Sequence, residues 1–199
     1  RDSYKGDMER AETVELDDSD WEVVATPHSV ELMPAEASGC RNYQGPVWYR
    51  KWFVIPAATR GKQVFIHFEA VMGKQKVYLN GHLVKEHLGG YLPFNIDLTA
   101  NGIQAGDSCL IAVMADNRDD KSYPPGKRQY TLDFSYHGGI YRDVWMIAKS
   151  DVSITDAVDA GKVAGGGVFI HYGRISEKKA DILIAVSYTH LRAHETGRN

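Results

Sequence analysis

Long apolar runs and blocks of like charge are both missing from this sequence, and their absence excludes two classes of partner. No segment approaches the ~18 consecutive apolar residues that a membrane-spanning helix needs. The formal net charge of -3 is spread along the 199 residues, which leaves no basic face for the phosphates of nucleic acid or for an anionic membrane. We therefore expect neither nucleic acid nor a membrane among the partners of the chain.

Cysteines and short catalytic motifs are also scarce. The chain has two cysteines, Cys40 and Cys109, and Cys109 lies in an apolar strand pattern where a buried thiol is expected rather than a disulfide. No G-x-S-x-G elbow, Walker loop or pair of C-x-x-C motifs occurs. His82 and His87 are five residues apart in a predicted strand, and this odd spacing predicts opposite faces and no metal pair.

Strand and turn signals, by contrast, occur along most of the chain. Residues 77–79 and 82–84 flank Asn80-Gly81, a pair typical of a two-residue type I′ hairpin turn. After a Gly-Gly bend, residues 94–98 alternate as on a half-buried strand, and Pro93 is expected at its start. Further strands are predicted at residues 47–55, 62–70, 108–114 and 140–147.

The predicted elements favour an all-β sandwich, because the strands are short and helical periodicity is almost absent. The length suits one domain of about 150 residues plus a remnant. Residues 115–139 are too polar and proline-rich for a regular element, and a loop of this length is often functional. Residues 1–20 are expected to form a loop that docks through Trp21, with a turn at Pro27 and a second loop at residues 34–46.

A second, incomplete strand pattern follows residue 149. Residues 152–156, 168–170 and 182–186 predict about three strands of a further sandwich. Residues 188–199 break the alternation, and we expect a non-native tail there. Because the chain starts at Arg1 rather than Met, we expect that it is truncated at its start, so the compartment stays open.

Two motif clusters resemble a known family. EHLGGYLPF at residues 86–94 and DFSYHGGIYRDV at residues 133–144, with Trp21 and the Pro27-His28 pair, resemble the N-terminal sugar-binding domain of family 2 glycoside hydrolases. This family contains β-galactosidases, β-glucuronidases and β-mannosidases, and Pro124-Pro125-Gly126 is similar to the glucuronidases. The resemblance implies a jelly-roll domain over residues 1–149 and part of an immunoglobulin-like domain over residues 150–187. It further implies a (β/α)8 barrel outside this chain.

The resemblance also implies which residues serve the sugar. Asp133 corresponds to an aspartate that reaches the sugar pocket of the barrel, and Asp116 followed by Asn117 is expected near the same pocket. Asp116 is also a candidate ligand for sodium; sodium or magnesium is a cofactor candidate for the parent enzyme. The residue types fit this role, since carboxylates and amides at a strand end bind sugar hydroxyls well.

The catalytic residues themselves are expected elsewhere. Family members are retaining enzymes that use two glutamates ~5–5.5 Å apart, and both belong to the barrel. Glu69 and Glu86 are therefore not candidates, and the fragment is expected to be inactive alone. The function expected for the parent is hydrolysis of O-glycosidic bonds by an exo-β-glycosidase; the alternative is a free-standing carbohydrate-binding module. The sugar and the oligomeric state of the parent stay open.

Overall fold

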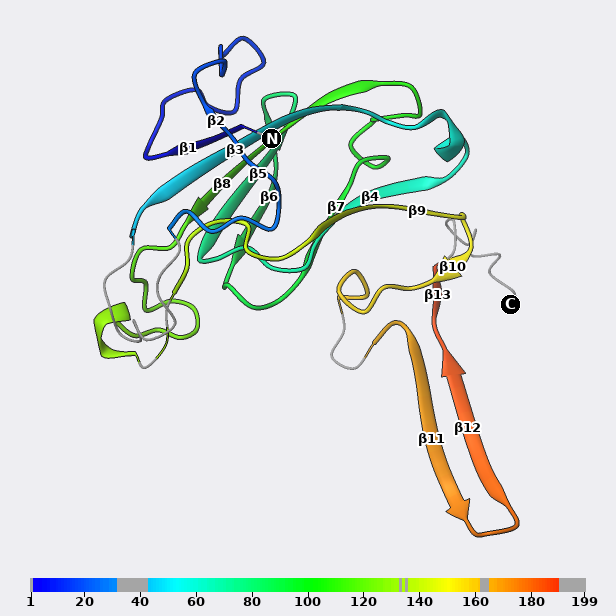
Figure 1. Ribbon diagram of the computed structural model, residues 1–199. Helices are drawn as coiled ribbons and strands as arrows, with labels where there is room; N and C mark the ends of the chain where they lie inside the picture. Colours follow the sequence, from blue (N-terminus) through cyan, green and yellow to red (C-terminus); the bar gives the residue numbers. More distant parts are fainter. Residues whose placement is uncertain (1, 32–42, 133, 135, 162–164, 190–199) are drawn as a thin grey trace, which may run out of the picture.

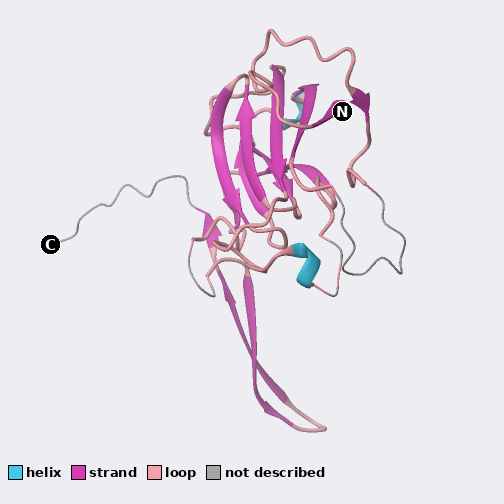
Figure 2. Ribbon diagram, turned by 90° about the vertical axis from the view of Figure 1, so that its left-hand side faces the viewer, coloured by secondary structure: helices cyan, strands magenta, loops and turns pink. Residues whose placement is uncertain are grey.

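The computed structural model describes residues 2–31, 43–132, 134, 136–161 and 165–189, and shows an all-β chain. Two antiparallel sheets form its main body (Figures 1 and 2). The six-stranded sheet has the order β2 (Glu22–Val23), β1 (Asp2–Lys5), β3 (Pro46–Val54), β8 (Ser108–Asp116), β5 (Lys74–Leu79) and β6 (His82–Leu88). The three-stranded sheet has the order β7 (Phe94–Asp97), β4 (Gln63–Phe68) and β9 (Val144–Lys149). The expected all-β jelly-roll sandwich is therefore confirmed, with short 3-10 turns η1 (Ala57–Thr59) and η2 (Gln129–Thr131) in its loops.

The core lies between the two sheets. Val64, Ile66 and Phe68 of β4 point inward as the alternation predicted, and the Phe68 ring stacks on Phe94 with centroids 4.8 Å apart. Cys109 is fully buried and free, while Cys40 lies outside the described residues. The core residues shared between the sheets are Val47, Tyr49, Val77, Leu79, Ile96, Leu98, Ile111, Val113, Ala115 and Ile140.

The outer face of the six-stranded sheet is covered in part by the N-terminal segment. Trp21 docks there as expected, packing with Ala11 against Trp48. The segment is not only a loop, however, since β1 pairs with β3 and β2. Arg50 of β3 is 1% exposed beneath this segment.

The predicted hairpin is present, with a register that the sequence did not reveal. Asn80 and Gly81 both have positive φ, 48° and 84°, as a type I′ turn requires. A β-bulge at Val84 shifts the pairing, so that His82 lies opposite Leu79 and His87 opposite Gln75. Both histidines therefore share one face, and the prediction of opposite faces was wrong, because a bulge adds one residue to the period. They lie about 13 Å apart along the strand, too far for one metal ion.

The chain beyond β9 forms separate small elements. Strand β9 itself begins at Val144, four residues later than predicted. β10 (Ser153–Ile154) pairs with β13 (Tyr188–Thr189), and β11 (Val168–Ile175) with β12 (Ala180–Val186) as a long hairpin that projects from the sandwich (Figure 1). The sequence left residues 188–199 out of the fold, yet Tyr188 and Thr189 pair with β10; residues 190–199 lie outside the described residues. None of the described helical segments has the length and apolar character of a membrane span.

Candidate functional site

Two of the predicted site residues, Asp116 and Asn117, lie at the end of β8, where several loops meet. Asp116 is the last residue of β8 and pairs with Pro46 on one side and Lys74 on the other. Gly73, with φ +87°, lies so close that an added Cβ would be 1.9 Å from the Asp116 carbonyl oxygen. Only glycine fits there, because a side chain would meet both backbone strain and a clash. The strand end is thus closely packed on its β5 side.

The Asp116 carboxylate is already paired with a cation. Its oxygens accept hydrogen bonds from Arg118 Nε at 3.0 and 2.9 Å and from the Arg118 backbone N–H at 3.0 Å. The hydrogen bond to Asp116 raises the pKa of the Arg118 guanidinium. The Asp116 side chain is 10% exposed and that of Arg118 65%, so the pair lies at the surface of the loop cluster.

This pairing does not fit a sodium or magnesium site at Asp116. A metal ion would have to displace the guanidinium, and hard cations need several oxygen ligands. Among the described residues, no group of three or more His, Cys, Asp or Glu side chains is placed to hold a metal ion.

Asn117 is buried, with 1% of its surface exposed. Its Nδ2 donates to the carbonyl oxygens of Tyr43, at 2.7 Å, and Tyr136, at 3.1 Å. Its Oδ1 accepts a hydrogen bond of 2.9 Å from the Gly45 backbone N–H. Both amide protons are therefore used within the protein, which leaves the side chain no free donor for a sugar.

The long loop after β8 is folded on itself. Asp119 accepts a hydrogen bond from the Gln129 backbone N–H at 3.0 Å, and Gln129 Nε2 donates to the Asn117 carbonyl oxygen at 2.6 Å. Tyr123 and Tyr136 are 7% and 4% exposed, and burial raises the pKa of Tyr123 to about 12. Much of this predicted loop is thus packed and hydrogen-bonded.

A second hydrogen-bond network lies beside the glycine pair of the motif at residues 133–144 and involves Tyr49, His28 and Ile140. The Tyr49 hydroxyl contacts His28 Nδ1 at 2.9 Å and accepts a hydrogen bond from the Ile140 backbone N–H at 3.4 Å. The His28 backbone N–H donates to the Ile140 carbonyl oxygen at 2.7 Å, and burial lowers the pKa of His28. A Cβ on Gly139 would lie 2.3 Å from the Tyr49 hydroxyl. The sequence marked His28 as a turn residue, but did not reveal Tyr49 as its partner.

Asp133, the first of the predicted sugar ligands, lies outside the described residues. The residues on either side of it differ in exposure: Leu132 is 8% exposed and Phe134 is 47% exposed. The two glutamates that the sequence set aside are elsewhere: Glu69 accepts a hydrogen bond from Trp145 Nε1 at 3.0 Å, and Glu86 pairs with Lys76 at 3.6 Å.

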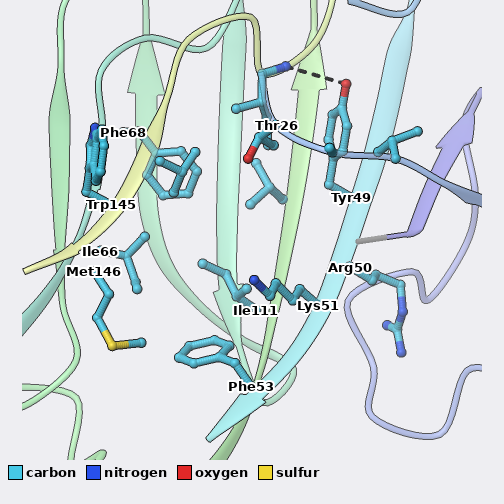
Figure 3. Close-up of a pocket in the computed structure, with 15 residues that line it drawn as sticks. Thr26, Tyr49, Arg50, Lys51, Phe53, Ile66, Phe68, Ile111, Trp145 and Met146 are labelled. Carbon is cyan, nitrogen blue, oxygen red and sulfur yellow. Dashed lines mark hydrogen bonds between the residues drawn. The ribbon is translucent and has the colours of Figure 1, made fainter. Parts of the chain in front are cut away.

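A cleft of about 350 Å³ opens between the sheets, away from Asp116. Figure 3 shows Ile66, Phe68 and Met146 on one wall and Ile111, Phe53 and Lys51 on the other, while Arg50 points away from the cleft. Its lining is mostly apolar and comes from β3, β4, β8 and β9, together with Ile140 and residues 24–26 outside the strands. The sequence did not predict this cleft, because a gap between sheets depends on packing across distant strands.

Comparison with known proteins matches residues 4–150 to the family model "Glycosyl hydrolases family 2, sugar binding domain". The chain is 39% identical to a β-galactosidase of Thermoanaerobacter pseudethanolicus over 150 residues, 75% of this chain and 20% of that protein. It is 30% identical to a β-glucuronidase of Formosa agariphila over 194 residues, 90% of this chain and 19% of that protein.

Solved structures agree with these relatives. A β-glucuronidase from glycoside hydrolase family 2 superposes with a TM-score of 0.77 and 29% identity, covering 94% of this chain and 20% of that one. Bacteroides uniformis β-glucuronidase 2, covalently bound to cyclophellitol-6-carboxylate aziridine, gives a TM-score of 0.76 at 29% identity, covering 92% of this chain and 20% of that one. The chain thus spans about a fifth of the length of these proteins.

Proposed function

Because the chain belongs to glycosyl hydrolase family 2, we propose that it is the N-terminal part of a retaining exo-β-glycosidase, whose substrate pocket it helps to shape. The observation that carries the proposal is the match of residues 4–150, from within β1 to the end of β9, to the sugar-binding domain of this family. Curated relatives in both the galactosidase and the glucuronidase groups support hydrolysis of β-galactosides or β-glucuronides as the activity of the parent.

The chemistry of the proposed reaction assigns the catalytic step to another part of the protein. A retaining mechanism needs one carboxylate as nucleophile and a second as acid and base, ~5–5.5 Å apart. Glu69 is engaged by Trp145, and Glu86 by Lys76 on the six-stranded sheet. We assign the catalytic pair to a (β/α)8 barrel of the parent protein, outside these 199 residues. The covalent aziridine complex of a similar glucuronidase supports a covalent glycosyl-enzyme step.

The part we assign to this domain is binding of the sugar at the rim of the barrel. Asp133 supplies a carboxylate to sugar hydroxyls, since a charged acceptor forms the stronger hydrogen bonds. Asp116 lies at the end of β8, but its carboxylate is shared with Arg118. A sugar hydroxyl would therefore meet an ion pair, and we assign Asp116 the weaker part of the contact.

The test is Asp133→Ala in the full-length enzyme. Loss of a charge-assisted hydrogen bond of about 1.5–3 kcal/mol lowers kcat/KM by roughly 10- to 150-fold, with the fold intact. Asp120→Ala is the matched control, because Asp120 lies in the same loop and only caps the Ser122 backbone N–H, at 2.7 Å, and pairs with Lys74 at 3.7 Å. Equal kcat/KM values for the two variants would refute the role of Asp133.

A further inference from the structure

We propose that the cleft between the two sheets binds a small carboxylic acid with an apolar body. The cleft has a volume of about 350 Å³, and its walls come mainly from β3 and β8 on one side and from β4 and β9 on the other. Neither Asp116 nor Asn117 lines it. The site is therefore separate from the sugar contacts proposed above, and the domain binds this acid whether or not the parent protein hydrolyses glycosides.

The walls of the cleft are suited to the apolar body of such a ligand. Strand β4 contributes Ile66 and Phe68, β9 contributes Met146, and the facing sheet contributes Phe53 and Ile111. Figure 3 shows the Met146 side chain pointing across the cleft toward Phe53. Protein interiors seldom leave gaps larger than a water molecule, because the side chains on either side of a gap lose contacts. An apolar ligand restores these contacts.

The volume of the cleft limits the size of the ligand. At about 350 Å³, it is more than twice as large as an engineered apolar cavity of ~150 Å³ that takes up benzene. It lies near the lower end of the range of ~300–1,000 Å³ that is typical of small-molecule pockets. A body of about eight carbon atoms therefore fits the cleft, and a much larger ligand does not.

Lys51 supplies a charge that favours an anionic ligand. It lies on β3 opposite Ile111 of β8, and the alternation along the strand turns its side chain to the same face as those of Tyr49 and Phe53. Figure 3 shows the Lys51 side chain extending toward Ile111 and the interior of the cleft. None of the side chains that line the cleft is acidic. Within the described part of the chain, Lys51 has no ion pair or hydrogen-bond partner for its ammonium group.

The other cation at the cleft is already in use. Arg50 is paired with Asp18 at 2.7 Å, and its side chain points away from the cleft (Figure 3). The charge that a ligand meets is therefore the Lys51 ammonium group, which donates charge-assisted hydrogen bonds to a carboxylate. Because Lys51 is exposed to water, we expect this contact to strengthen binding about fivefold, the upper end for an exposed ion pair.

Methyl NMR titrations of the 199-residue chain with octanoate and with 1-octanol test the site. Both probes have the same apolar chain, but only octanoate is charged at neutral pH. Octanoate should shift the methyl signals of Ile66, Ile111 and Met146 and should bind about fivefold more tightly than 1-octanol. The signals of Ile170 and Leu183, which are exposed on the hairpin of β11 and β12, should not follow them. Shifts confined to this hairpin, or equal dissociation constants for the two probes, would overturn the proposal.

Lys51→Met tests the charge, since it removes the ammonium group and keeps most of the apolar stem. The variant should bind octanoate about fivefold more weakly than wild type and 1-octanol within about twofold of wild type. Lys85→Met is the matched control, because Lys85 is an exposed cation on β6, at the far edge of the same sheet. It should change neither dissociation constant. An undiminished preference for octanoate in Lys51→Met would overturn the proposal of an anionic ligand.

Met146→Trp tests the cleft itself. Met146 is 38% exposed, so the fold should tolerate a larger side chain there, and urea unfolding checks this. The indole ring would occupy space in the cleft and should weaken binding of octanoate and of 1-octanol alike, by at least about tenfold. Unchanged binding of both probes in the folded variant would place them elsewhere and overturn the proposal.

Discussion

Arg50 offers the sharpest test of how the N-terminal segment is held on the sandwich. Its Nε donates to Asp18 Oδ2 at 2.7 Å, and its Nη atoms donate to the carbonyl oxygens of Ala11, Thr13 and Leu16. The residue is 1% exposed. Arg50→Met keeps much of the apolar stem and removes the charge and these donors, so it isolates the polar part of the anchor.

The expected loss can be bounded from this geometry. Breaking a buried ion pair by removing one partner costs about 3–5 kcal/mol. The Asp18 side chain is 23% exposed, so water can partly rehydrate its carboxylate, and we expect the lower end, about 3 kcal/mol. With an m-value of about 2–3 kcal/mol/M in urea, this shifts the unfolding midpoint down by about 1–1.5 M.

The assay is urea unfolding of the 199-residue chain followed by tryptophan fluorescence, since Trp21 of this segment packs against Trp48 of the sheet. Lys85→Met is the control, because Lys85 is an exposed cation on β6. Limited proteolysis should also cut residues 6–20 faster in Arg50→Met than in wild type. A midpoint shift no larger than that of Lys85→Met would refute the view that Arg50 anchors this segment.

Three further outcomes follow from the same structure. Gly73→Ala should lower the free energy of unfolding at least twice as much as Gly61→Ala does. Both glycines have positive φ, whose strain costs about 1–2 kcal/mol, but only at Gly73 would the added Cβ meet backbone, at 1.9 Å. Equal losses of the two variants in urea unfolding would count against this packing. Burial lowers the pKa of His28 and His87 in the folded chain. The unfolded chain therefore binds more protons than the folded one, and stability should fall as the pH drops below 6.5, the ordinary pKa of histidine. Thermal midpoints at pH 7.5 and 5.5 measure this, and a His28→Gln, His87→Gln double variant with an undiminished drop would refute the assignment. Residues 1–149 alone should be more soluble than the 199-residue chain, because most large apolar side chains of β11 and β12 are exposed. Sedimentation of both forms measures their solubility. A short form less soluble than the full chain would contradict this prediction.

The sequence predicted the elements whose signals are local. The Asn80-Gly81 turn and the alternation of Val64, Ile66 and Phe68 each determine their structure within a few residues. Strand β1 could not be predicted in this way, since its four residues become a strand only by pairing with β3, more than forty residues later. The bulge at Val84 also left no local signal.

Of the candidate site residues, the sequence placed Asp116 and Asn117 along the chain but did not reveal their contacts. Asp116 and Asn117 lie where the pattern placed them, at the end of β8. An asparagine after a strand looks the same in the sequence whether it faces solvent or holds two loops together. Only the partners of Asn117, up to 74 residues away, reveal that its amide is used internally.

The anomeric configuration of the first product released by the full-length enzyme shows whether it is a retaining β-glycosidase. Proton NMR during hydrolysis of 4-nitrophenyl β-galactoside and β-glucuronide measures it. We expect that at least one substrate is cleaved and that the sugar appears first as its β-anomer, as double displacement requires. Release of the α-anomer first, or no cleavage of either substrate, would refute the proposal of a retaining β-galactosidase or β-glucuronidase.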